Sequence, residues 1–245
     1  MDSQAMTIAV IVPVWNEAEA LRATMASIIR EHPRETKPAS SDSMNTGSRD
    51  PGLELIVADG GSDDGSAGIA REAGAQVIAS PRRQRAAQMN LGAEAAMGDV
   101  MLFLHADTLL PAGWARVLAN AFAHDPKLVG GAFRRRFVPG SRFLRFTCAA
   151  ADVRGRCLGW FLGDQAIFVR REIFRELGGF APLPVCEDLD FTRRLARRGR
   201  VRLLKETVHT SDRRFHRRGA LRQSLADLVT AIRFLCEQRN RKSRE

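Results

Sequence analysis

Short apolar runs alternate with segments of helical periodicity through the first 105 residues, and this alternation constrains the fold more than any other feature. The runs at residues 8–13, 53–58, 76–79 and 100–105 are predicted strands. They are short and largely uninterrupted by polar residues, as is typical of strands buried on both faces. The segments at 17–29, 66–73 and 84–96 are predicted helices, the first capped by Asn16. The pattern predicts an α/β fold with a mainly parallel central sheet and helices on both faces.

The second half of the chain is less regular. Strands are expected at residues 131–137, 166–169 and 201–204, and helices at 171–177 and 189–198. An amphipathic helix is expected at 220–236, followed by a polar tail at 237–245. Residues 33–52 are rich in Pro, Ser, Asp, Asn and Gly and nearly devoid of apolar residues, so we predict a disordered insertion there.

Composition narrows the class of protein. A hydrophobic fraction of 44% excludes a wholly disordered chain, and a net charge of +10 favours an anionic partner. The four cysteines form no C-x-x-C pair, which argues against a zinc site or a disulfide framework and favours a reducing compartment. Neither a signal peptide nor an apolar stretch of the roughly 18–20 residues that span a bilayer is found. We therefore predict a cytoplasmic location.

The carboxyl ends of the predicted parallel strands carry polar clusters, and ligands bind at that edge of such sheets. The first strand ends in P-V-W-N-E at residues 13–17, the second in D-G-G-S-D-D-G at 59–65, and the fourth in H-A-D at 105–107. Carboxylates there suit hydrogen-bond donors such as a base N–H or ribose hydroxyls, and Asp107 could hold a hard divalent cation. The alternative for each cluster is a structural turn or a helix cap.

Five motifs in order resemble family 2 glycosyltransferases of the GT-A fold, over roughly residues 6–222. They are P-x-W-N-E at 13–17, I-V-A-D-G-G-S-D-D-G-S at 56–66, L-F-L-H-A-D-T at 102–108, G-D-Q-A-I-F-V-R-R at 163–171 and E-D-L-D-F at 187–191. The chain is most similar to the small bacterial branch whose metal motif is H-A-D rather than D-x-D. The resemblance implies an inverting glycosyltransferase of hexosyltransferase type that uses a nucleotide-diphosphate sugar and Mg²⁺ or Mn²⁺.

The resemblance also implies roles for residues on the donor side. Pro13 and Glu17 would flank the nucleoside, Asp59 would accept the base N–H, and Asp107 would bind the metal that bridges the diphosphate. His105 departs from the common motif, in which an acid contacts ribose or metal-bound water. In some GT-A enzymes a histidine after the last strand adds a metal ligand, here His209, although a lone histidine is more often structural.

Basic residues near the same edge are candidates for diphosphate binding. Arg85 is the candidate at the start of a helix, and Arg213 with Arg214 would offer paired guanidinium donors to a leaving diphosphate. For Arg85 the alternative is a solvated helix start.

Inverting transfer to a hydroxyl needs a base, and the resemblance gives that role to Asp188. Its alternative is capping, because acids in the first turn of a helix are favoured by the helix dipole. Glu187, Asp164 and Gln165 are expected on the acceptor side.

Two other enzyme or binding classes stay open at this stage. A sugar nucleotidyltransferase would need a Gly-rich basic loop after the first strand, which residues 13–17 do not provide. A nucleic-acid-binding protein is suggested by charge alone, since the basic stretch lacks interleaved aromatics. A GT-A domain without activity is disfavoured by the joint presence of Asp59, Asp107 and Asp188.

The C-terminal third concentrates the positive charge. Residues 193–222 hold twelve Arg or Lys and two acids, and the amphipathic helix follows. One interpretation is that this helix closes the domain against the sheet. The other is that it contacts the inner face of an anionic membrane, which would suit a lipid or other apolar acceptor. The nucleotide, the sugar and the acceptor are not specified by these patterns.

Overall fold

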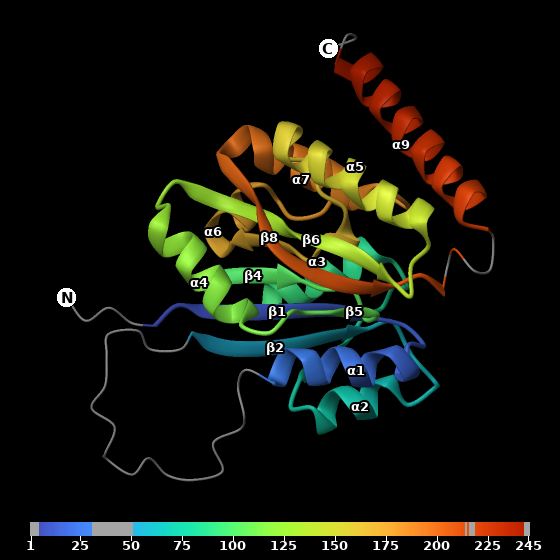
Figure 1. Cartoon of the computed structure of the whole chain (residues 1–245). Coiled ribbons are helices and arrows are strands. Elements are labelled where there is room, and N and C mark those ends of the chain that lie inside the picture. The colour runs from blue at the N-terminus through green and yellow to red at the C-terminus, as the bar shows by residue number, and fades with distance from the viewer. Residues whose placement is uncertain (1–4, 31–50, 214, 216–218, 243–245) are drawn as a thin grey trace.

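The computed structural model describes residues 5–30, 51–213, 215 and 219–242, so the predicted insertion lies outside the described residues up to residue 50. Elements of the first half follow the predicted alternation closely (Figure 1). They are β1 (Thr7–Val14), α1 (Ala18–Ile29), β2 (Gly52–Asp59), α2 (Ser66–Glu72), β3 (Gln76–Ala79), α3 (Arg85–Ala95) and β4 (Val100–Phe103).

The second half contains more regular structure than the sequence patterns indicated. Its elements are β5 (Thr108–Leu109), α4 (Trp114–His124), β6 (Leu128–Val138), α5 (Arg142–Leu158), the 3₁₀ turn η1 (Gly163–Gln165), β7 (Ile167–Arg170), α6 (Arg171–Glu176), α7 (Glu187–Arg198), β8 (Arg200–Ser211) and α9 (Ala220–Lys242). Helices α4 and α5 were not predicted, and β8 is three times the length expected from residues 201–204.

The eight strands form one curled sheet in the order β3-β2-β1-β4-β7-β6-β8-β5. Strands β1 to β4 pair in parallel, as does β6 with β8. The pairs β4–β7, β6–β7 and β5–β8 are antiparallel, so the sheet is mixed. The prediction of an α/β fold with a parallel central region is confirmed.

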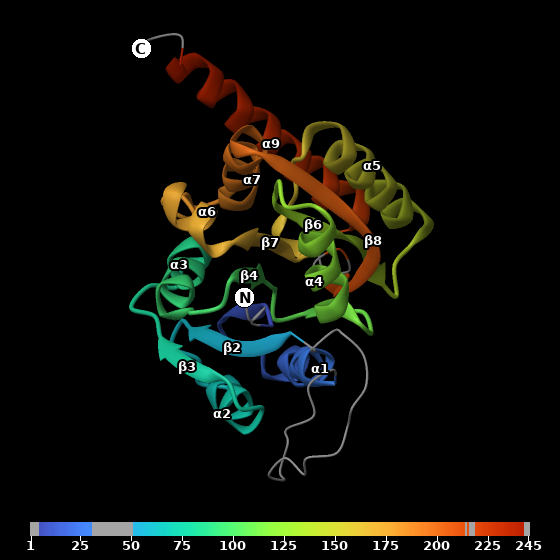
Figure 2. The same ribbon diagram turned by 90° about the vertical axis from the view of Figure 1, so that its left-hand side faces the viewer.

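Strand β1 is continuously apolar because both of its faces are buried. Ile8, Val10 and Val12 belong to one core cluster, which also holds the buried faces of α1, α2 and α4. Ala9 and Ile11 belong to a second cluster with α3, α6 and α7. Figure 2 shows α3, α6 and α7 on one side of the sheet and α1 and α4 on the other. The sheet is therefore sandwiched, which fixes the ends of its central strands.

Helix α9 extends away from the body of the molecule (Figures 1 and 2). Five of its large apolar side chains are between 46% and 60% exposed: Leu221, Leu225, Leu228, Val229 and Ile232. The interpretation that this face closes the domain against the sheet is therefore wrong. Within the described residues, no helix is both long and apolar enough to cross a bilayer.

Candidate active site

The carboxyl ends of β1, β2 and β4 meet at one edge of the sheet. Val14 lies opposite Asp59 in the β1–β2 register, and Leu104 donates its backbone N–H to Ile11 at 3.0 Å. Partly buried Pro13 belongs to the same strand end. The polar clusters that follow these strands are therefore neighbours in space, as parallel pairing requires.

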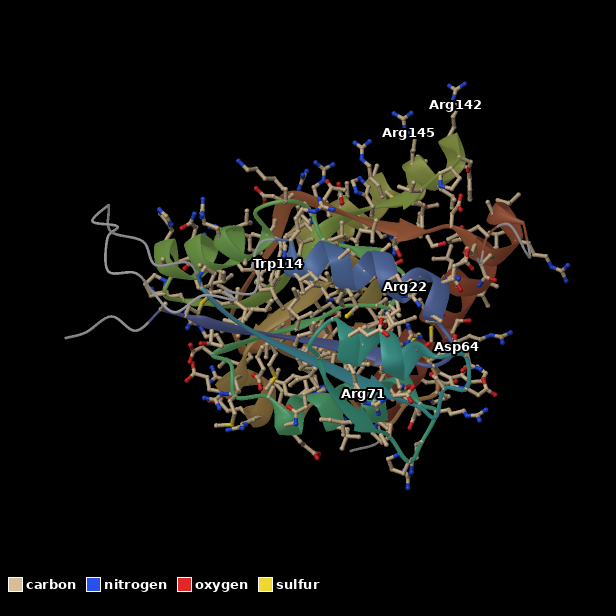
Figure 3. All side chains as sticks on the ribbon, turned by 90° about the horizontal axis from the view of Figure 1, so that it is seen from below. Arg22, Asp64, Arg71, Trp114, Arg142 and Arg145 are labelled. Atoms are coloured by element: carbon tan, nitrogen blue, oxygen red, sulfur yellow. The ribbon has the colours of Figure 1, made fainter. Side chains whose placement is uncertain are left out.

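Asn16 does not cap α1, contrary to the prediction. Its side-chain amide donates to Asp63 Oδ1 at 2.8 Å and accepts from the Asp63 backbone N–H at 3.0 Å. Its backbone has a positive φ of 51°, a conformation that asparagine tolerates better than most residues. The first turn of α1 is served instead by Asp64, which accepts from Ala18 N at 2.9 Å. Figure 3 shows Asp64 close to the start of α2. Its carboxylate accepts from both Ala18 N and Ser66 N, so it connects the first turn of α1 to the start of α2.

Asp59 is buried at the end of β2, with 8% of its surface exposed. It accepts hydrogen bonds from the backbone N–H of Ser62 at 3.2 Å and from the Ser62 hydroxyl at 2.5 Å. Behind it, Gln88 of α3 donates to the carbonyls of Val14 and Ala58 at 2.7 and 2.9 Å. Gln88 was not predicted, and its signal was a glutamine on an otherwise small and apolar helix face. These bonds hold the ends of β1 and β2 together.

Three charged residues from distant parts of the chain meet at the sheet edge formed by the ends of β1, β2 and β4. Arg213 contacts Glu17 Oε2 at 2.7 Å and Asp107 Oδ2 at 3.8 Å. Burial, and the nearby negative charge of Glu17, raise the pKa of Asp107 above its ordinary value, although Arg213 opposes them. Arg213 thus lies at the sheet edge where a diphosphate-binding residue is predicted, whereas Arg214 lies outside the described residues.

A second charged cluster surrounds His105. Arg85 Nη1 lies 3.3 Å from His105 Nε2, and Arg85 Nε pairs with Glu187 at 2.8 Å. A Cβ built on Gly163 would come within 2.5 Å of His105 Nε2, so only glycine allows this approach. Glu187 is almost fully buried, and burial raises its pKa although Arg85 opposes the shift. Arg85 therefore faces the strand edge, where it has two side-chain partners although its side chain is 41% exposed.

Asp188 is fixed in the same cluster at the start of α7. One carboxylate oxygen accepts from the Gly163 backbone N–H at 2.6 Å, and the other accepts from Leu189 N at 2.6 Å. Burial raises the pKa of Asp188 above its ordinary value, against these two hydrogen bonds. A partly buried carboxylate with a raised pKa and a fixed orientation is chemically suited to accept a proton.

An ion pair with β6, which was not predicted from the sequence, holds the loop that contains Gly163. Asp164 accepts from Arg135 of β6 through both carboxylate oxygens. Burial opposes ionisation of Asp164, but the Arg135 guanidinium outweighs it and holds the pKa below its ordinary value. Gln165 is fully buried, and its side-chain oxygen accepts from Arg154 at 3.2 Å and from Leu162 N at 3.1 Å. In this structure Gln165 supports the loop.

The donor set near Asp107 fits a divalent cation in its chemistry. The described residues contain no group of three or more His, Cys, Asp or Glu side chains arranged to hold a metal. The Asp107 side chain is nevertheless 25% exposed and lies near Glu17, and a bound cation would offset the burial and the negative charge that raise its pKa. His209 lies opposite Leu109 in the β5–β8 register, and Leu109 is two residues after Asp107 in the chain. Such a cation would take its remaining ligands from bound phosphate or water oxygens.

Known proteins resemble this chain in sequence and in fold. Residues 9–199 match the family model described as Glycosyl transferase family 2. A search of curated proteins gave no match. The fold is similar to the mannosyltransferase PcManGT of Pyrobaculum calidifontis, solved with GDP-Man and Mn²⁺, at a TM-score of 0.62 and 22% identity over 84% of this chain and 57% of that one.

Two further solved structures extend the comparison. TarS 1–349 of S. aureus with UDP-GlcNAc gives a TM-score of 0.62 and 16% identity over 85% of this chain and 59% of that one. Glucosyl-3-phosphoglycerate synthase of Mycobacterium tuberculosis, with Mn²⁺, UDP and glucosyl-3-phosphoglycerate, gives 0.60 and 22% over 92% and 79%. At these identities the likeness concerns the fold. The chain spans less than two thirds of the mannosyltransferase and of TarS.

Proposed function

Because the chain belongs to glycosyl transferase family 2 and is therefore a glycosyltransferase, we propose that it transfers a hexosyl group from a nucleotide-diphosphate sugar to an acceptor hydroxyl, with inversion. The observation that carries the proposal is Asp188, held by two backbone N–H groups beside His105 and Gly163. The family match over residues 9–199 sets aside the nucleotidyltransferase and nucleic-acid-binding alternatives.

The donor would lie along the edge formed by β1, β2 and β4. Pro13 and Glu17 would flank the nucleoside, and Asp59 would accept a base N–H. Arg85 and Arg213 would neutralise the diphosphate, because guanidinium groups bind phosphate oxygens in pairs. The similar structures that contain GDP-Man, UDP-GlcNAc and UDP support a donor of this class.

A divalent cation would be held through Asp107, with His209 as a further candidate ligand. When bound, Mg²⁺ or Mn²⁺ would neutralise the charge that develops on the departing diphosphate. The Mn²⁺ in two of the similar structures supports this assignment. Arg213 would share that task, since it already lies within 3.8 Å of Asp107.

Asp188 would act as the general base. The acceptor oxygen forms a bond to the anomeric carbon while the bond from that carbon to the phosphate oxygen breaks. The hydroxyl proton passes to the Asp188 carboxylate, and the nucleoside diphosphate leaves with the electron pair. A raised pKa moves Asp188 closer to the operating pH, which favours proton acceptance in the transition state. Glu187 and Asp164 would keep this side of the site in place through Arg85 and Arg135.

Exchange of one carboxylate for an amide tests the base. Asp188→Asn should lower kcat by about 10²–10⁴ while the Kd for the nucleotide stays within about twofold. Asp190→Asn is the matched control, because Asp190 lies in the same helical turn but pairs with Arg194 at 2.8 Å. Loss of nucleotide binding in Asp188→Asn, or an equal loss of kcat in both variants, would contradict the assignment.

We also propose that α9 contacts the surface of an anionic membrane. Helix α9 exposes large apolar side chains, and α5, which contacts α9, carries the exposed apolar side chains Val153 and Leu158. Figure 3 shows Arg142 and Arg145 standing out from the start of α5. Basic groups beside an apolar face favour anionic bilayers by about 1 kcal/mol per charge near the surface. Co-sedimentation with anionic vesicles at low salt, lost at about 0.5 M salt, is expected. Equal binding to neutral vesicles, or none at low salt, would refute it.

A further inference from the structure

An opening lies beside α5, at the sheet edge where β6 ends. It is a cavity of about 650 Å³ between the carboxyl ends of β6 and β8 and the first half of α5. The β6–β8 register places Arg134 opposite Thr207 and Arg136 opposite His209, and all four residues line the cavity. The volume is within the range of small-molecule sites in proteins.

The lining is strongly positive. Four arginines, Arg134, Arg135, Arg136 and Arg145, face it together with one acid, Asp152. Arg134 pairs with Asp152 at 2.6 Å, so that acid neutralises only one of the four. Neither Arg136 nor Arg145 forms an ion pair with any residue that the structure describes. Two guanidinium groups, one from a strand and one from the facing helix, are thus available to an anion.

Buried polar atoms without partners lie in the same wall. The side chain of Arg135 is 8% exposed, and its Nε has no hydrogen-bond partner. Asp152 is likewise 8% exposed at its side chain, and its Oδ1 has no partner. Both atoms are inaccessible to solvent, so they do not themselves meet a ligand, and Arg136 and Arg145 remain the groups that an anion can reach.

The remaining wall is apolar. Phe137 lines the cavity beneath Arg135, whose guanidinium carbon lies 5.0 Å from the ring centre. Val138 and Phe146 are 53% and 70% exposed at the same opening. Large apolar side chains beside uncompensated arginines favour a ligand with both an anionic group and an apolar part.

The cavity is joined to the reacting centre through one ion pair. Arg135 lines the cavity and binds Asp164, and the adjacent Gly163 donates its backbone N–H to Asp188. His209, which also lines the cavity, lies opposite Leu109 in the β5–β8 register, and Ser211 of the same strand donates its backbone N–H to the Asp107 carbonyl at 3.1 Å. A molecule anchored here could therefore extend toward Asp188.

We propose that this cavity binds the acceptor through an anionic group, a phosphate or a carboxylate, with its apolar part on Phe137 and Phe146. The acceptor hydroxyl is then a different group of the same molecule and points toward Asp188. The proposal rests on the proposed function, since it assigns the acceptor class to that reaction. Arg136 and Arg145 determine the preference for an anion.

Binding of hexyl phosphate, inorganic phosphate and hexanol by the whole chain, measured by titration calorimetry, tests the proposal. Hexyl phosphate should bind at least about tenfold more tightly than either of the others, because each lacks one half of the recognition. Equal affinity for hexanol would overturn the anionic group, and equal affinity for inorganic phosphate would overturn the apolar part.

Variants separate this site from the donor site. Arg136→Gln and Arg145→Gln should each weaken hexyl phosphate about tenfold and leave UDP and GDP affinity unchanged, whereas Arg213→Gln should do the reverse. Arg142→Gln is the matched control, one helical turn from Arg145 and outside the lining. Unchanged hexyl phosphate binding in both cavity variants would overturn the inference and leave the donor assignment intact. Failure of UDP and GDP to bind would count against the proposed function alone.

Discussion

The buried ion pair between Arg135 and Asp164 predicts a large and pH-dependent loss of stability when Arg135 is replaced by methionine. Methionine keeps an unbranched apolar stem and lacks the guanidinium, so the variant leaves the Asp164 carboxylate buried and without this partner. Arg135 is 8% exposed and Asp164 23% exposed at their side chains. Removing one partner of such a pair lowers the free energy of unfolding by about 3–5 kcal/mol. Because Asp164 is partly exposed, we expect a loss of about 3 kcal/mol.

The pH dependence follows from the sign of the Asp164 shift. In the native protein the pKa of Asp164 is held below its unfolded value of about 3.9, so the pair stabilises the fold above that pH. This contribution is lost as the pH falls through the folded pKa. Without Arg135, burial of Asp164 favours the neutral carboxyl and is opposed only by the weaker effects of His105 and Arg154, so acid no longer removes a strong favourable interaction. The difference in unfolding free energy should therefore be greatest at neutral pH and should already narrow as the pH falls from 7 to about 4, because acid stabilises the variant relative to the native protein.

Urea unfolding of both proteins at pH 7 and pH 4 measures this difference. Arg198→Met is the matched control, because Arg198 pairs with Glu176 at the surface, where both side chains are 49% exposed. That change should stay within about 1 kcal/mol at either pH. A similar loss in the two variants, or a gap between Arg135→Met and the native protein that does not change with pH, would refute the reasoning.

Three further predictions concern packing, the insertion and catalysis. Gly131→Ala should destabilise the fold by about 1–3 kcal/mol, because its Cβ would lie 1.9 Å from the Arg202 carbonyl, whereas Gly68→Ala meets nothing within 4 Å and should be tolerated in a thermal melt. Replacement of residues 33–50 by a short Gly/Ser linker should leave the melting temperature and nucleotide affinity unchanged, and a cooperative loss of stability would contradict the prediction from composition. The acid limb of the kcat profile should lie above the ordinary aspartate pKa, because Asp188 must be ionised and its pKa is raised; a limb at or below that value would exclude Asp188 as the base.

The first half of the fold could be predicted because its strands are buried on both faces and leave uninterrupted apolar runs. Helix α5 could not, because its buried positions are mostly small or polar: Leu144, Cys148, Ala151, Asp152 and Gly155. Helix α4 did carry a clear signal, with Trp114, Leu118, Ala121 and Phe122 at helical spacing, and was overlooked. Strand β8 was shortened in the prediction because polar residues 205–207 interrupt its apolar pattern.

The candidate site could be predicted where it depends on strand ends, as for Asp59 and Asp107. Parallel pairing alone brings those residues to one edge. Contacts between distant segments left no local pattern, so the Arg135–Asp164 pair was missed. The prediction that Asn16 caps α1 is wrong because its side chain forms hydrogen bonds with Asp63 in the neighbouring turn.

Release of nucleoside diphosphate from nucleotide sugars follows the proposed reaction at its donor side. The native chain and Asp107→Ala would be incubated with UDP- and GDP-linked hexoses in Mn²⁺ and in EDTA, with the released UDP or GDP quantified. In Mn²⁺ the native chain should release nucleoside diphosphate from at least one donor. This release should be lost in EDTA and in the Asp107→Ala variant. Release that is undiminished in EDTA or in Asp107→Ala, or no binding and no release with any donor, would contradict the proposed reaction.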